Sequence, residues 1–174
     1  GHWMPVGNEG SGRVIAAGES DAALALVGQR VGVFGGEMYA GYRCLPASQC
    51  MAFPEKISAE QAASCFVNPM TALGFMETRL MERQQAIVHT AAASNLGHML
   101  LRLCQADDVP LVNIVRSDEQ VALLKSKGAD WVLNSQAESF MKDLIAALVA
   151  TGATLAFDAI GGGRGVNHIL TAME

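Results

Sequence analysis

The chain has 174 residues, of which 51% are hydrophobic and 17% charged, and its formal net charge is -5. This composition is typical of a globular protein with a substantial core and excludes an intrinsically disordered chain. The acidic balance argues against nucleic acid as a partner, and no apolar run approaches the roughly 20 residues that a membrane span needs. Residues 1–4 are interpreted as a remnant of an expression tag, and no secretory signal is visible.

The first third of the chain predicts short antiparallel strands separated by glycine and proline turns. The expected strands are runs rich in β-branched or aromatic residues, at 13–16, 30–34, 39–43 and 50–53. Tyr39 and Tyr42 lie on the third of these, where contact with a substrate and simple packing both remain open. Ser58 and Gln61 have the spacing of a capping box, so a helix is expected to begin there.

From residue 86 onward, apolar strands alternate with helices, which predicts βαβ units and a parallel sheet. The expected strands are 86–89, 111–115, 131–133 and 154–157, and the helices begin near Leu96, Asp118, Ser139 and Gly165. A doubly wound dinucleotide fold normally has six such strands, so we expect the chain to be part of a larger protein.

Histidine and cysteine show no metal-type spacing. His89 ends the first parallel strand and is interpreted as a core histidine with its hydrogen bonds satisfied rather than as a proton relay. The four cysteines contain no C-x-x-C pair and are expected to be reduced and mostly buried.

The turn after the first parallel strand is the place where a phosphate group can meet the N-terminus of a helix. Aligned with the pattern G-x-G-x-x-G, the glycine positions fall on Ala92, Ser94 and Gly97, of which only the last is glycine. Ser94 and Asn95 could donate hydrogen bonds to phosphate oxygens. A turn of small residues selected only for packing remains an alternative.

A second cofactor contact is expected at the end of the next strand. An acidic residue there would bind a ribose 2′-hydroxyl and favour NAD, whereas the guanidinium of Arg116 suits the 2′-phosphate of NADPH. Arg116 could also be an ordinary surface arginine, and Asp118 is close enough to keep NAD open. The two contacts together favour NADPH.

Short segments along most of the chain carry a family pattern in their order and spacing. They are G-N-E-G-S-G-R-V at 7–14, G-Q-R-V at 28–31, N-P-M-T-A at 68–72, K-G-A-D at 127–130 and F-D-A-I-G-G at 157–162. Together they resemble the medium-chain dehydrogenase/reductase superfamily. The turn A-A-A-S-N-L-G at 91–97 and the strand ending in Arg116 resemble its zinc-free NADPH:quinone oxidoreductases and 2-enoyl thioester reductases.

The resemblance implies an α/β fold, with a truncated Rossmann-type parallel sheet preceded by the β-rich tail of a GroES-like domain. Residues 5–56 would be the C-terminal part of that catalytic domain, and residues 57–174 a dinucleotide-binding domain that is incomplete at its C-terminus. Asn8 and Val67 stand where zinc-dependent members have metal ligands, so no metal is expected.

The resemblance also implies the cofactor site and the reaction. Hydride would pass from NADPH to a small-molecule electron acceptor, a quinone or another α,β-unsaturated carbonyl, without zinc, in a cytoplasmic enzyme. The catalytic residue is unknown, and this chain alone is expected to be inactive. The expected cofactor-binding residues are Asn68, Thr71, Ala92, Ala93, Ser94, Asn95, Leu96, Gly97, Arg116, Ser117, Asn134, Asp158, Ala159 and Gly161.

Two further expectations concern association and an alternative role. The apolar sheet edge left after the fourth parallel strand favours a homodimer formed by strand pairing. A non-catalytic nucleotide-binding or structural protein on the same fold is the alternative, because two of the three fingerprint glycines are replaced.

Overall fold

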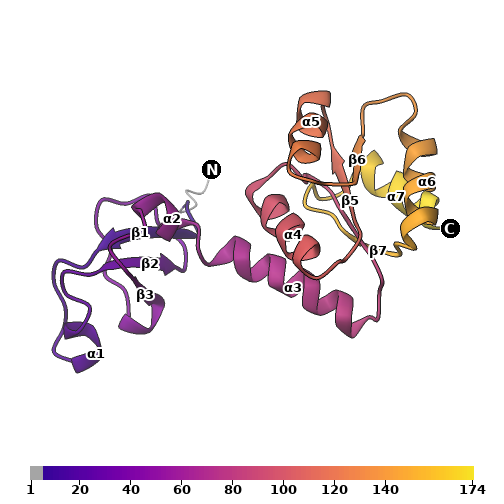
Figure 1. Cartoon of the computed structure of the whole chain (residues 1–174). Coiled ribbons are helices and arrows are strands. Elements are labelled where there is room, and N and C mark those ends of the chain that lie inside the picture. The colour runs from indigo at the N-terminus through magenta and orange to yellow at the C-terminus, as the bar shows by residue number, and fades with distance from the viewer. Residues whose placement is uncertain (1–5) are drawn as a thin grey trace. The chain divides into compact units, whose positions relative to one another are not determined.

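A computed structural model describes residues 6–174, and the interpreted tag remnant at residues 1–4 lies outside them. The chain forms two compact units, of which the first ends at Met70 and the second begins at Thr71 (Figure 1). This division comes later than residue 57, where the resemblance placed the start of the second domain, because helix α2 (Ala59–Ala63) packs on the strands that precede it.

The first unit is built on an antiparallel sheet with the strand order β1-β2-β3. Its elements are β1 (Glu9–Arg13), α1 (Asp21–Leu24), β2 (Arg30–Phe34), the 3-10 helix η1 (Ala47–Gln49), β3 (Cys50–Phe53) and α2. The capping box at the start of α2 is confirmed, since Ser58 and Gln61 exchange hydrogen bonds of 2.9 and 3.2 Å. A Cβ at Gly32 would lie 2.8 Å from the carbonyl oxygen of Ala62, so glycine lets α2 approach β2.

Two of the four strands expected in this unit are wrong. β1 covers Glu9–Arg13 rather than 13–16, because its register is set by pairing with β2 and not by its own glycine-rich sequence. Residues 39–43 form a loop in which the side chains of Tyr39 and Tyr42 are 86% and 83% exposed, so neither tyrosine serves packing.

The second unit has a four-stranded parallel sheet with the order β6-β5-β4-β7, which confirms the predicted α/β fold class. Its first element is the part of helix α3 (Val67–Met81) that begins at Thr71. The others are β4 (Ile87–His89), α4 (Asn95–Ala106), β5 (Leu111–Val115), α5 (Asp118–Ser126), β6 (Trp131–Asn134), α6 (Phe140–Thr151), β7 (Leu155–Phe157) and α7 (Arg164–Met173). The expected alternation of strands and helices is therefore observed, with strand ends and helix starts that coincide or differ by one residue.

Helices cover both faces of the parallel sheet (Figure 1). Ile87 and Leu111 pack in one core with residues of α3, α4 and α5, whereas Val88 and Val112 pack in the other with residues of α6 and α7. Because both faces are buried, the strands read as nearly continuous apolar runs, as is typical of parallel sheets. No helix that the structure describes is long and apolar enough to cross a membrane.

The cysteines are free, but the expectation that they are mostly buried is wrong. Cys104 is buried in the core of the second unit, whereas Cys50 and Cys65 are partly buried and Cys44 is exposed. Burial raises the pKa of the Cys104 thiol to about 12, which makes this thiol unreactive.

His89 is completely buried at the end of β4, as expected for a core histidine. Its Nδ1 atom lies 3.2 Å from the carbonyl oxygen of Phe157, and its ring meets Phe75 edge to face. Its Nε2 atom has no partner among the described residues, so the expectation that both ring nitrogens are satisfied is wrong for this atom. Burial lowers the pKa of His89 below its ordinary value, and the bond to Phe157 offsets this only in part.

We predict that His89 makes the second unit less stable in acid. Its pKa is lower in the folded chain than in the unfolded chain, so the stability it contributes is present above about pH 6.5 and is lost as the pH falls below that value. Thermal unfolding measured at pH 7 and at pH 5 should show that the His89→Gln variant loses less stability between these two pH values than the unaltered chain does. Identical pH slopes for the two chains would contradict this role.

Candidate functional site

The order in which strands are added to the parallel sheet changes side between β4 and β7. From β4 the order proceeds to β5 and β6 on one side, and β7 then pairs with β4 on the other side. In open α/β sheets, ligands bind at such a switch point, beyond the carboxyl ends of the strands. The segments that follow β4, β5 and β7 meet at this edge, so they define the candidate site.

The turn after β4 leads directly into helix α4. Ala91 adopts a left-handed conformation with φ of 50°, and Ser94 caps the helix by accepting a 3.2 Å hydrogen bond from the N–H of Gly97. The N–H groups of Asn95 and Leu96 lie in the first helical turn, where helix geometry provides no acceptor. They are therefore available to an anion at the positive end of the helix dipole.

Gly97 allows α4 to begin close to the turn. A Cβ at this position would lie 2.6 Å from the carbonyl carbon of Ala92 and 2.8 Å from its Cα, distances that real structures do not tolerate. Ala92 is itself completely buried, and its N–H donates to the carbonyl oxygen of Ile114. Ala92 and Gly97 therefore shape the turn, whereas the exposed Ser94 and Asn95 are accessible to a ligand.

Two charged side chains lie just beyond the end of β5, that of Arg116 and that of Asp118. The side chain of Arg116 is exposed and makes no hydrogen bond or ion pair within the described part of the chain. Ser117 caps α5 by accepting from the N–H of Gln120. The carboxylate of Asp118 accepts a 2.7 Å hydrogen bond from the side-chain amide of Asn134, at the end of β6. Asn134 thus contacts Asp118 instead of presenting both its polar atoms to a ligand.

The segment after β7 is held by one carboxylate. Asp158 accepts hydrogen bonds from the hydroxyl of Thr90 at 2.6 Å and from the N–H groups of Ile160, Gly161 and Gly162 at 2.9–3.1 Å. Partial burial alone would raise the pKa of Asp158, but these hydrogen bonds outweigh it and lower the pKa to about 2. The carboxylate is therefore ionised at neutral pH, and its bonding capacity is used within the loop.

The sequence interpretation did not include Thr90 or Gly162 in this site. A recognisable signal was present, because Asp followed by small residues often accepts N–H groups of its own turn. Asn68 and Thr71, which were included, lie in the first part of α3, and the division between the two units falls between them. The structure brings the predicted residues 92–97, 116–117, 134 and 158–161 to one edge of the sheet.

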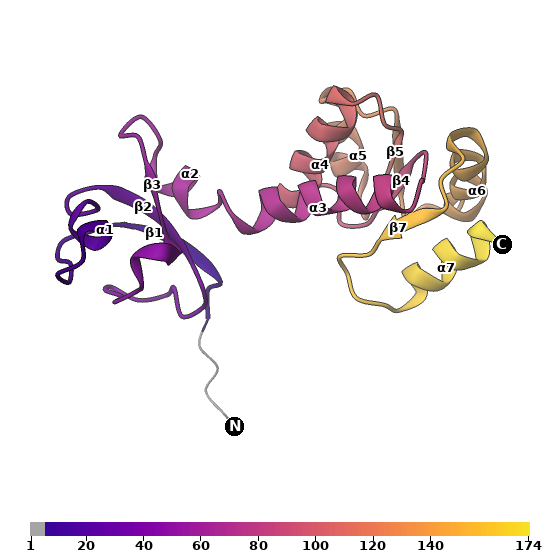
Figure 2. The same ribbon diagram turned by 90° about the horizontal axis from the view of Figure 1, so that it is seen from below.

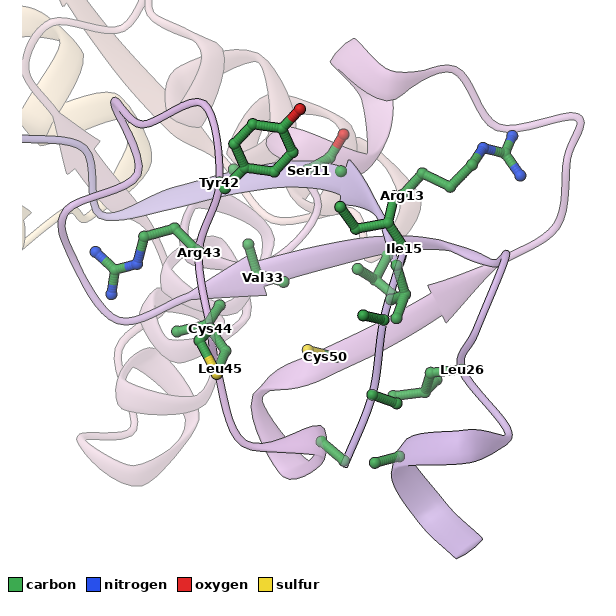
Figure 3. Close-up of a pocket in the computed structure, with 18 of the residues that line it drawn as sticks. Ser11, Arg13, Ile15, Leu26, Val33, Tyr42, Arg43, Cys44, Leu45 and Cys50 are labelled. Atoms are coloured by element: carbon green, nitrogen blue, oxygen red, sulfur yellow. The ribbon is translucent and has the colours of Figure 1, made fainter. Parts of the chain in front are cut away.

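A cavity of about 610 Å³ lies in the first unit (Figure 3). Side chains from β1, β2, β3 and the 38–47 segment line it, and most of them are apolar. Arg13 and Arg43 extend away to opposite sides of the cavity in Figure 3. Arg13 forms an ion pair with Glu55 at 3.2 Å, and Arg43 forms one with Glu37 at 2.7 Å. The described residues include no group of three or more His, Cys, Asp or Glu side chains that could hold a metal ion.

No protein-family model matches the sequence, but individual proteins do. The chain is 28% identical over 158 residues to prostaglandin reductase-3 from Mus musculus, covering 90% of this chain and 41% of the mouse protein. It superimposes on a proposed NADPH:quinone reductase from Mesorhizobium loti with a TM-score of 0.86 and 33% identity, covering 96% of this chain and 49% of that one. A mycobacterial protein solved in complex with NADPH gives a TM-score of 0.73 and 26% identity, over 90% of this chain and 49% of that one.

The chain thus resembles the medium-chain dehydrogenase/reductase superfamily in both sequence and fold. It spans less than half the length of each of these three relatives. The segments that carried the sequence resemblance fall on both units, and two of them, 91–97 and 157–162, lie at the carboxyl ends of β4 and β7.

We predict that the contact between Gly97 and Ala92 limits substitution at position 97. Gly97→Ala should lower the free energy of unfolding by about 1–3 kcal/mol, because α4 must move away from the turn. Gly74→Ala is the matched control: Gly74 is exposed within α3, a Cβ there meets nothing within 4 Å, and alanine favours helix by about 0.5–1 kcal/mol. Thermal unfolding of both variants measures the effect, and equal behaviour would contradict the packing argument.

Proposed function

We propose that the second unit binds NADPH at the carboxyl edge of its parallel sheet, and that the protein to which this chain belongs reduces a quinone or another α,β-unsaturated carbonyl. Residues 57–174 would then act as the dinucleotide-binding domain and residues 5–56 as part of a catalytic domain. The relatives named above support this proposal, as does the chemistry of the groups left free at this edge.

The observation that carries the proposal is the difference between Arg116 and Asp118. An acidic side chain at this strand end would bind the ribose 2′-hydroxyl of NADH, but Asp118 is already bonded to Asn134. The neighbouring guanidinium of Arg116 is exposed and unpaired within the described residues, and it suits a 2′-phosphate. The free groups therefore favour NADPH over NADH.

The residues present fit the phosphate groups of this cofactor. The N–H groups of Asn95 and Leu96 would bind the pyrophosphate, the hydroxyl of Ser94 retains a hydrogen to donate, and Arg116 would bind the 2′-phosphate. When bound, NADPH would supply the hydride. The chain itself would orient the dinucleotide between the turn after β4 and the loop after β7.

We also propose that the reaction needs no zinc. Asn8 and Val67 occupy positions where zinc-dependent members of the superfamily have metal ligands. The amide of asparagine is a weak zinc ligand, and valine has no donor atom at all. A non-catalytic nucleotide-binding role remains the second candidate, since Ala92 and Ser94 replace two fingerprint glycines. Oxidation of NADPH by the full-length protein with a small quinone would separate the two candidates.

We predict that this chain binds NADPH more tightly than NADH, as measured by calorimetric titration. Arg116→Ala should weaken NADPH binding by about ten- to a hundredfold, the value of a charged hydrogen-bonded pair, and leave NADH binding nearly unchanged. Arg102→Ala is the matched control, because Arg102 is an exposed arginine of α4. Equal weakening of both cofactors by Arg116→Ala would contradict recognition of the 2′-phosphate, and binding of neither cofactor would contradict the proposal as a whole.

A further inference from the structure

Thr90 connects two strands at the switch point. It follows the last residue of β4, and only 3% of its surface is exposed. Its backbone N–H donates to the carbonyl oxygen of Phe157 at 3.2 Å, and its hydroxyl donates to Asp158 at 2.6 Å and accepts from the N–H of Ala159 at 2.9 Å. Thr90 thus makes three hydrogen bonds to residues 157–159, at the end of β7 and just beyond it. Strand β7 pairs with β4 and lies beside it in Figure 2.

The segment held in this way has little stiffness of its own. Gly161, Gly162 and Gly163 all adopt positive φ angles, of 88°, 106° and 74°. Glycine has access to more backbone conformations than any other residue, so a run of three requires outside contacts to keep one shape. Asp158 provides these contacts by accepting the N–H groups of residues 160–162, and the Thr90 hydroxyl fixes the Oδ1 atom of Asp158.

The N–H groups bound by Asp158 are not available to a phosphate. The loop 158–162 would therefore contribute to cofactor binding through its shape, while the anion would be bound by donors beyond the neighbouring strand β4, at the start of α4. That division of roles requires a fixed distance between the two segments. Thr90 is the residue immediately before the first segment and is bonded to the second.

We propose that Thr90 is a positioning residue for cofactor binding, whose hydroxyl fixes the loop 158–162 against the turn that begins at Ala91. This inference rests on the proposed function. It assigns to Thr90 a role that requires an oxygen atom at this position and not merely a side chain of the right volume.

The test compares Thr90→Val, which keeps the shape but removes the hydroxyl, with Thr90→Ser, which keeps the hydroxyl. Thr90→Val should weaken NADPH binding about tenfold and speed amide hydrogen exchange at residues 160–162 by a similar factor, because Asp158 loses its fixed partner. Thr90→Ser should restore both values to within about twofold of the unaltered chain, since a serine hydroxyl can make the same bonds. Thr90→Ala replaces the valine variant if that one does not fold.

Thr151→Val is the matched control. Thr151 is also buried and its hydroxyl also donates to a backbone carbonyl, that of Ala147 at 2.7 Å, but it ends α6, ahead of the N-terminal end of β7. This variant should lose stability without losing NADPH affinity. Unchanged NADPH binding by Thr90→Val would overturn the inference and leave the proposed function intact, as would failure of Thr90→Ser to restore binding. Absence of NADPH binding by the unaltered chain would overturn both.

Discussion

The approach of helix α4 to the turn that precedes it is the constraint on which the candidate site depends. Gly97 lacks the Cβ that would collide with Ala92, so the first helical turn lies directly behind the end of β4. Its unpaired N–H groups then point toward the carboxyl edge of the sheet, where the helix dipole favours negative charge. Packing requires glycine at this single position of the fingerprint, and the small residues Ala92 and Ser94 stand at the other two.

Hydrogen bonds within the chain determine which charged groups remain available to a ligand. The two acids at this edge are both engaged, Asp118 with an asparagine of the neighbouring strand and Asp158 with its own loop and Thr90. Arg116 has no such partner among residues 6–174. Although this edge contains two acids and one arginine, the groups left without a partner among the described residues are a cation and the N–H donors at the start of α4, which is the arrangement that a phosphorylated ligand requires.

The sequence predicted the second unit much better than the first, for a physical reason. Strands buried on both faces, such as β5, are apolar throughout and are recognisable by themselves. β1 has the sequence EGSGR and becomes a strand only because β2 pairs with it, and that distant partner is not visible in a local pattern. The bond between Thr90 and Asp158 joins residues 68 positions apart, so it too appeared only in the structure.

Mapping the bound cofactor onto individual residues tests the central claim most directly. In an NMR titration with NADPH, the account predicts that the amide signals of residues 93–97, 116–117 and 158–162 shift together and saturate at one concentration. Signals of residues around the cavity in the first unit, such as Val33 and Cys50, should stay in place. Shifts confined to that cavity, with the edge of the parallel sheet unaffected, would contradict the assignment of the cofactor site.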